Sequence, residues 1–139
     1  MNWIFWALLS ALFAAATAVL AKIGVAHVDS NLATAIRTTV VLVFAWAIAI
    51  SLGKHGEIRQ VDGRAWLFLT LSGLATGLSW LCYFRALQLG PASRVAPLDK
   101  LSVVLVMVFA VIFLGEKLSP AALVGGGLIA AGAVVMVLA

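Results

Sequence analysis

The amino-acid sequence predicts an all-α integral membrane protein with five transmembrane helices. Hydrophobic residues make up 65% of the 139 residues and charged residues only 10%, whereas soluble domains contain about 45–50% and about 25%. The hydrophobic residues also gather into five continuous runs, each of about 20 residues, the length that a helix needs to cross a bilayer. A soluble domain of this size cannot bury so much apolar surface. Soluble enzymes and nucleic-acid-binding proteins are therefore excluded.

The five runs define the expected spans of a single domain, residues 1–139. The spans are residues 3–21, 32–52, 66–87, 95–114 and 120–139. They lack the alternation of apolar and polar residues that marks the strands of an outer-membrane barrel. We therefore expect a multi-pass protein of the cell membrane, meaning the plasma membrane of a bacterium or archaeon (the inner membrane where there are two).

Turn-forming residues separate the spans. Asp29 precedes the second span, Gly90-Pro91 follows the third, and Ser119-Pro120 precedes the fifth. An acidic or hydroxyl residue at a helix start caps free backbone N–H groups, and proline suits the first helical position. Residues 53–64 form the one long polar connection. No linker is long enough for a second domain.

The basic residues give only a weak orientation signal. If the N-terminus is inside, the inner connections carry Lys54, Arg59, Arg64 and Lys117, and the outer ones carry Lys22, Arg85 and Arg94, with Arg37 and Lys100 somewhat deeper. The positive-inside rule needs a clear excess on one side. Two interpretations remain: an N-inside protein with a weak signal, or a chain that inserts both ways and pairs antiparallel.

Four ionisable residues lie at membrane depth: Arg37, Arg85, Asp99 and Lys100. Because the second span begins, the third ends and the fourth begins on one side, all four are expected in the same leaflet. Charges within spans usually have partners or line a wet cavity. We predict that Arg37, Asp99 and Lys100 gate a pathway or bind substrate. Asp99 is expected to form a structural or gating ion pair, with Arg37 or with a neighbour of Lys100 on another helix, ahead of direct contact with substrate. The alternative for the longer side chains is snorkelling to the headgroups.

Aromatic residues late in the third span add to this candidate site. Trp80 and Tyr83 could stack on a substrate, and Trp80 shares a helix face with Phe84. The alternative is an interfacial aromatic belt in contact with lipid, which is the better interpretation for tryptophans near span ends.

Enzyme, cofactor and metal signatures are missing from the sequence. Cys82 is the only cysteine, and the two histidines, His27 and His55, lie in different polar connections. No P-loop, zinc-protease or nucleophile-elbow motif occurs. We therefore expect no catalytic residues, no cofactor, no metal ligands and no nucleic-acid partner.

Two blocks of sequence resemble the EamA-type carriers of the drug/metabolite transporter superfamily. Residues 83–97, YFRALQLGPASRVAP, resemble that family's junction between spans three and four, and residues 113–132 resemble its ending, with a Leu-Gly-Glu turn before a glycine-rich span. Typical members have ten spans in two halves of opposite orientation, and this chain resembles one half. The resemblance implies an inverted second copy, because such carriers build their pathway from inverted repeats.

The resulting functional prediction is transport of a small metabolite, such as an amino acid or a related solute, by alternating access. The expected partners are that solute, the lipid bilayer and a second copy of the chain in a homodimer, which the near-balanced charges favour as antiparallel. Two alternatives remain open. The chain could be a non-transporting subunit of another membrane protein, or a small multidrug cation exporter, although the first span contains no acidic residue.

Overall fold

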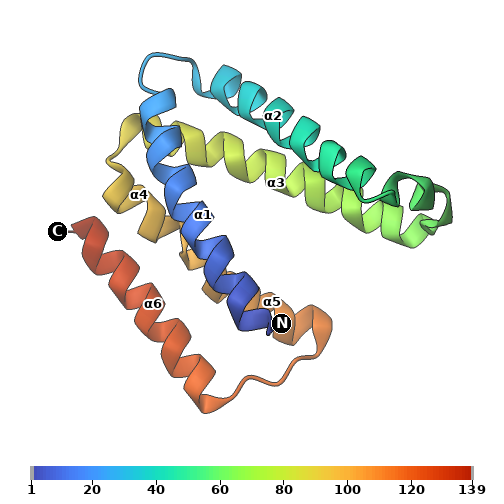
Figure 1. The fold of residues 1–139 in the computed structure, drawn as a ribbon. Helices are drawn as coiled ribbons and strands as arrows, with labels where there is room; N and C mark the ends of the chain where they lie inside the picture. The colour runs from blue at the N-terminus through green and yellow to red at the C-terminus, as the bar shows by residue number, and fades with distance from the viewer. Residues whose placement is uncertain (1, 139) are drawn as a thin grey trace. The chain divides into compact units, whose positions relative to one another are not determined.

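The computed structural model describes residues 2–138, and they form helices joined by short connections (Figure 1). The elements are α1 (Trp3–Gly24), α2 (Ser30–Ser51), the 3-10 helix η1 (Lys54–Gln60), α3 (Gly63–Leu89), α4 (Ala92–Asp99), α5 (Leu101–Leu114) and α6 (Pro120–Leu138). No strand occurs in this range. Five helical segments of the described chain are long and apolar enough to cross a membrane. The predicted fold class is confirmed.

The helix caps expected from the sequence are present. The Asp29 carboxylate accepts hydrogen bonds from the backbone N–H groups of Asn31 (2.9 Å) and Leu32 (3.2 Å) at the start of α2. The Ser119 hydroxyl oxygen accepts one from the N–H of Ala122 (3.1 Å) at the start of α6. Each cap satisfies N–H groups that have no partner within the helix.

Several helices extend beyond the predicted spans, because polar first and last turns do not register as hydrophobic. The third helix begins at Gly63 rather than at residue 66, and the Asp62 carboxylate caps it by accepting from the N–H of Ala65 (2.9 Å). The first helix continues to Gly24. Residues 54–60 of the expected polar connection form η1. The predicted end of the last span, Ala139, lies outside the described residues.

The fourth predicted span consists of two helices, α4 and α5, which are interrupted at Lys100. Pro97 lies inside α4, and proline both lacks a backbone N–H and collides with the carbonyl one turn earlier. The N–H of Lys100 bonds to the carbonyl of Pro97 at 3.0 Å, a contact three residues back that tightens the turn. Pro97 therefore weakens the helix on its N-terminal side, and the interruption follows three residues after it.

The chain divides into two compact units. In the first, which takes the described parts of residues 1–22 and 89–139, α6 packs against α4 and α5. The Met107 side chain of α5 approaches α6 closely at Gly126, where a Cβ atom would lie 2.8 Å from the Sδ atom of Met107. The Lys22 ammonium donates a hydrogen bond to the carbonyl of Gly90 (2.9 Å) and so links α1 to the turn before α4.

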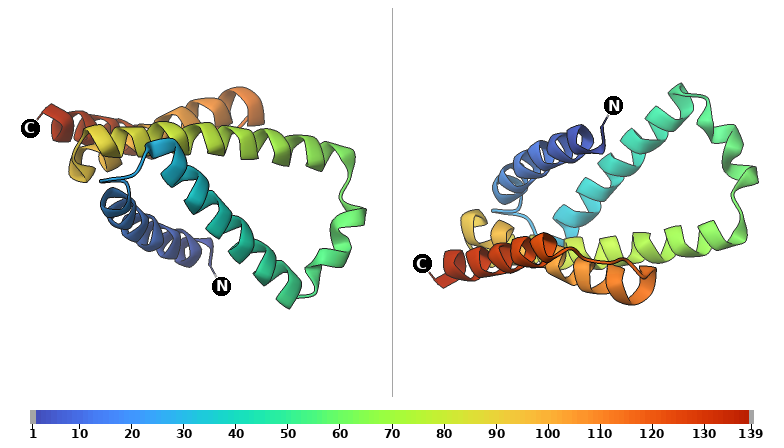
Figure 2. Two further views of the ribbon diagram at one scale, coloured as in Figure 1. Left: turned by 90° about the horizontal axis from the view of Figure 1, so that it is seen from above. Right: turned by 90° about the horizontal axis from the view of Figure 1, so that it is seen from below.

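The second unit, residues 23–88, contains α2, η1 and most of α3. Figure 2 shows that α2 and α3 meet near the start of α2 and diverge toward η1. The Gln88 amide nitrogen donates to the carbonyl of Val28 (2.7 Å) and, at 3.4 Å, to that of Val25. These bonds fasten the connection before α2 to the last turn of α3. Val25 is buried, as are Leu87 and Phe84.

Most of the large hydrophobic side chains are on the surface of the helices. Leu12 of α1 is 65% exposed, Phe44 of α2 is 67% exposed and Phe113 of α5 is 76% exposed. Such a surface is stable in lipid, where apolar side chains face hydrocarbon and helices satisfy their own backbone hydrogen bonds. The protein is therefore a multi-pass integral membrane protein.

Candidate functional site

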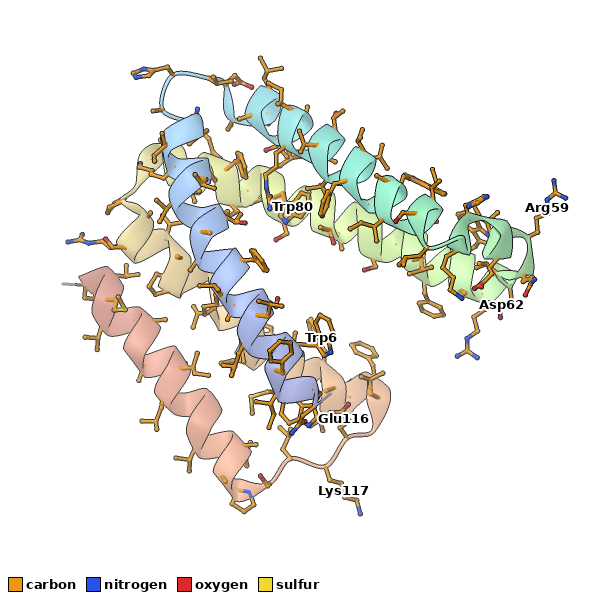
Figure 3. The ribbon with its side chains drawn as sticks, in the orientation of Figure 1. Trp6, Arg59, Asp62, Trp80, Glu116 and Lys117 are labelled. Atoms are coloured by element: carbon orange, nitrogen blue, oxygen red, sulfur yellow. The ribbon has the colours of Figure 1, made fainter. Side chains whose placement is uncertain are left out.

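The most unusual local arrangement in the second unit is a cation stacked on aromatic rings. The Cζ atom of Arg37, on α2, lies 4.1 Å from the ring centroid of Trp80 and 5.5 Å from that of Phe84, both on α3. Figure 3 shows Trp80 between the two helices. Phe84 is buried, while Arg37 and Trp80 are half-buried. The cation–π attraction between a guanidinium and an aromatic face contributes about 0.5–2 kcal/mol of stabilisation.

The stacking holds the guanidinium at membrane depth. Arg37 lies seven residues into α2, about 10 Å from the helix start, and Trp80 lies nine residues before the end of α3, about 13 Å from that end. These two helix ends meet on one side of the unit. A snorkelling arginine would extend toward the headgroups. The Arg37 head group instead lies closer to the deeper ring, Trp80, than to the shallower ring, Phe84.

The guanidinium N–H donors of Arg37 are unused within this unit. In residues 23–88 no oxygen accepts a hydrogen bond from its guanidinium, and no carboxylate lies within ion-pair distance. Neither α2 nor α3 contains an aspartate or glutamate. A guanidinium carries five N–H donors and is always charged. The electrostatic partner of the Arg37 guanidinium on α3 is the Tyr83 side chain, and no carboxylate of α2 or α3 balances its charge.

The threonines beside Arg37 do not add donors to the site. The hydroxyl of Thr34 donates to the carbonyl of Ser30 (2.8 Å), and that of Thr38 donates to the carbonyl of Thr34 (2.7 Å). Both hydroxyl protons are thus used within α2, although the oxygens can still accept. Thr34, Thr38 and Arg37 share one polar face of α2, and the free donors of that face belong to Arg37.

The other predicted site residues lie as follows. Tyr83 is half-buried on α3, in the same unit as Arg37 and Trp80. Asp99 and Lys100 belong to the first unit, at the interruption between α4 and α5. Their charged groups are 3.7 Å apart, and the two side chains are 41% and 55% exposed. The pairing of Arg37 with Asp99, and the binding or gating roles of these residues, stay predictions.

Sequence reasoning did not identify Gln88 or the contact between Arg37 and the two rings. Gln88 fixes the end of α3 against the segment before α2, and so sets the register in which Arg37 meets Trp80. The feature of the sequence that could have identified Gln88 is a neutral amide in the last turn of an apolar helix. The stacking itself joins residues far apart in sequence, and no local spacing encodes it.

Comparison with known proteins identifies the family of this chain. The sequence profile of the EamA-like transporter family matches residues 1–138. The chain belongs to the EamA-like transporter family. It is also similar to a protein of Sinorhizobium sp. named "Uncharacterized transporter in cobO 3'region", with 58% identity over 135 residues, which cover 97% of this chain and 96% of that one. No solved structure matches the chain.

Membership of the EamA-like transporter family accounts for the apolar helices and supports membrane transport as the general activity. The same findings point to a transporter rather than an enzyme. The resemblance deduced from residues 83–97 and 113–132 is thereby confirmed.

Proposed function

We propose that this EamA-like protein carries a small, amino-acid-like metabolite across the membrane by alternating access, as an antiparallel homodimer. The observation that supports this most strongly is the Arg37 guanidinium, held over Trp80 at membrane depth. Intramembrane charges of this kind mark substrate pathways in carriers. The Trp80 ring holds the guanidinium in place, and the N–H groups of Arg37 have no acceptor within residues 23–88.

The dimer part of the proposal follows from the pathway that a carrier needs. Carriers with inverted repeats bind substrate between two halves of opposite orientation. A chain with five spans provides one such half, and a second copy inserted the other way provides the other. The near-equal numbers of basic residues in the connections on the two sides are consistent with insertion in both orientations.

Transport in reconstituted vesicles tests the proposal. Vesicles containing the purified full-length protein are mixed with radiolabelled amino acids, and uptake is compared with that of empty vesicles. We expect uptake of at least one amino acid, and a decrease of about tenfold or more in Arg37→Gln, since a hydrogen bond to a charged group contributes about 1.5–3 kcal/mol. No uptake above empty vesicles for any amino acid would contradict the proposed function.

A matched control separates the role of Arg37 from loss of any basic side chain. Arg85 lies on α3 in the same unit, is exposed, and donates to the Gln88 side-chain oxygen (3.1 Å). Arg85→Gln is therefore expected to keep most of the uptake. Equal losses in the two variants would remove Arg37 from the pathway.

The same assay tests the dimer when wild-type and Arg37→Gln chains are mixed in equal amounts before reconstitution. If both copies must carry Arg37, only about one quarter of random dimers is active. Independent chains would retain about one half of the uptake. The second result would contradict a shared pathway that needs Arg37 from both copies.

A further inference from the structure

We propose that the Arg37 site selects its substrate by a single carboxylate group, so that the transported solute is a monocarboxylate. This inference rests on the proposed function and specifies the chemical class of its substrate. It is carried by the arrangement of Arg37 against Trp80 and Phe84, and by the distribution of charge in α2 and α3.

The contact with Trp80 involves no oxygen acceptor, so the N–H groups of the Arg37 guanidinium keep their hydrogen-bonding capacity. The Trp80 ring lies against the Arg37 head group at 4.1 Å, whereas the N–H donors of a guanidinium point outward in its own plane. A carboxylate is also planar, and its two oxygens accept two parallel N–H bonds from an arginine. The Trp80 ring thus positions the Arg37 head group, and a carboxylate is the ligand whose two oxygens match its N–H groups.

The charge available in this unit suits a ligand with one negative charge. Arg37 is the only basic residue within α2. Arg85 of α3 is exposed and bonds to Gln88, and Arg64 lies at the opposite end of α3, beside the ring of Phe68. A phosphate dianion or a dicarboxylate would bring a second charge with no cation in α2 or α3 to balance it. Desolvation of such a charge in an apolar site is costly.

The same distribution of charge disfavours a cationic ligand. Neither helix carries an acidic side chain, so an ammonium group beside Arg37 would meet like charge and no compensating carboxylate. The amine of an amino acid would need to be bound elsewhere, whereas its carboxylate matches Arg37 directly. The prediction is therefore that the carboxylate, and not the amine, is required for recognition at this site.

Three probes of equal length test the inference: pentanoate, pentanamide and pentylamine. Each is titrated into the full-length protein in phosphatidylcholine vesicles while tryptophan fluorescence is recorded, because a ligand on Arg37 changes the surroundings of Trp80. We expect a saturable change with pentanoate, and at least tenfold weaker responses to the amide and the amine. Equal responses to pentanoate and pentanamide would overturn the requirement for charge.

Variants identify the site of the response. Trp80→Phe is expected to remove the fluorescence change, and Arg37→Gln to weaken pentanoate binding at least tenfold. Arg37→Lys keeps the charge but not the planar fork. Its affinity for pentanoate is expected to lie between those of the wild type and Arg37→Gln. Arg85→Gln should bind as the wild type does, and helical circular dichroism establishes that each variant is folded. Unchanged pentanoate binding in Arg37→Gln would overturn the assignment.

A second titration separates a soluble carboxylate from a lipid phosphate as the oxygen ligand. Phosphatidylglycerol is added to the vesicles in place of part of the phosphatidylcholine, and inorganic phosphate is tested alone. We expect pentanoate to bind in both lipids with similar affinity. A fluorescence change that follows phosphatidylglycerol and excludes pentanoate would assign the site to a headgroup and overturn the proposal.

Binding and uptake fail in distinguishable ways. If pentanoate does not bind but the vesicles accumulate amino acids, recognition through the carboxylate alone is wrong and the proposed transport function stands. If pentanoate binds at Arg37 but no solute is accumulated, the oxyanion site stands and the transport function is contradicted.

Discussion

At the scale of single residues, one intramembrane arginine is the centre of the account. Arg37 could be identified from the sequence because a charge inside an apolar run is costly and seldom accidental. Its contact with Trp80 could not be predicted, because it depends on how α2 meets α3. The shared face of Trp80 and Phe84 was visible as a spacing of four residues. Their role as a platform for Arg37 required the structure.

Gln88 provides a prediction at this scale. Replacement of Gln88 by Leu leaves the carbonyls of Val25 and Val28 without their side-chain donor, and an unsatisfied partly buried group costs about 1–3 kcal/mol. We expect the free energy of unfolding in mixed detergent micelles to fall by that amount. The measurement is loss of helical circular dichroism as denaturing detergent is added.

Gln60→Leu is the matched control, because Gln60 is exposed in η1. It is expected to change the free energy of unfolding by less than about 0.5 kcal/mol. Equal effects of the two substitutions would show that Gln88 does not fasten the end of α3.

At the scale of elements, the sequence indicated where helices start and stop better than where they break. The caps at Asp29 and Ser119 follow from side chains that bond to N–H groups two or three residues away, so they were predictable. The interruption at Lys100 was not deduced, although Pro97 lies three residues before it. Hydropathy averages over the whole run and does not register a proline whose neighbours are apolar.

Packing of α6 against α5 provides a prediction for this scale. Gly126→Leu places a side chain where even a Cβ atom would lie 2.8 Å from the Met107 Sδ atom. Met107 can shift to admit a methyl group, but a full leucine side chain forces α5 and α6 apart. We expect the free energy of unfolding to fall by about 1–3 kcal/mol, measured by the same detergent titration.

The neighbouring residue is the control for this substitution. A Cβ atom at Gly127 meets no atom within 4 Å, and leucine has a better helix propensity than glycine. Gly127→Leu is therefore expected to leave the monomer equally stable or more stable. A larger loss at Gly127 than at Gly126 would place the tight contact of α6 elsewhere.

At the scale of the whole molecule, composition alone was sufficient for the class of protein. The high apolar content and the five runs predicted a multi-pass helical membrane protein, and five membrane-length helical segments occur in residues 2–138. The substrate could not be read from composition, since lipid-facing side chains dominate it. The few polar residues carry that information, and their meaning depends on contacts between helices such as that of Arg37 with Trp80.

The central claim is that water and solutes reach the face of α2 that carries Arg37. Labelling of single cysteines tests this, in a Cys82→Ser background because the native thiol is exposed. Val41 lies four residues after Arg37, on the same face and deeper in the span, whereas Thr39 lies on the opposite face.

The decisive measurement is the rate at which a membrane-impermeant, charged thiol reagent modifies Val41→Cys and Thr39→Cys in membrane vesicles. We expect Val41→Cys to be modified about tenfold or more faster than Thr39→Cys, because a desolvated thiol in lipid does not ionise to the reactive thiolate. Modification of Thr39→Cys alone, or of neither variant, would show that the Arg37 face is dry and would contradict the account.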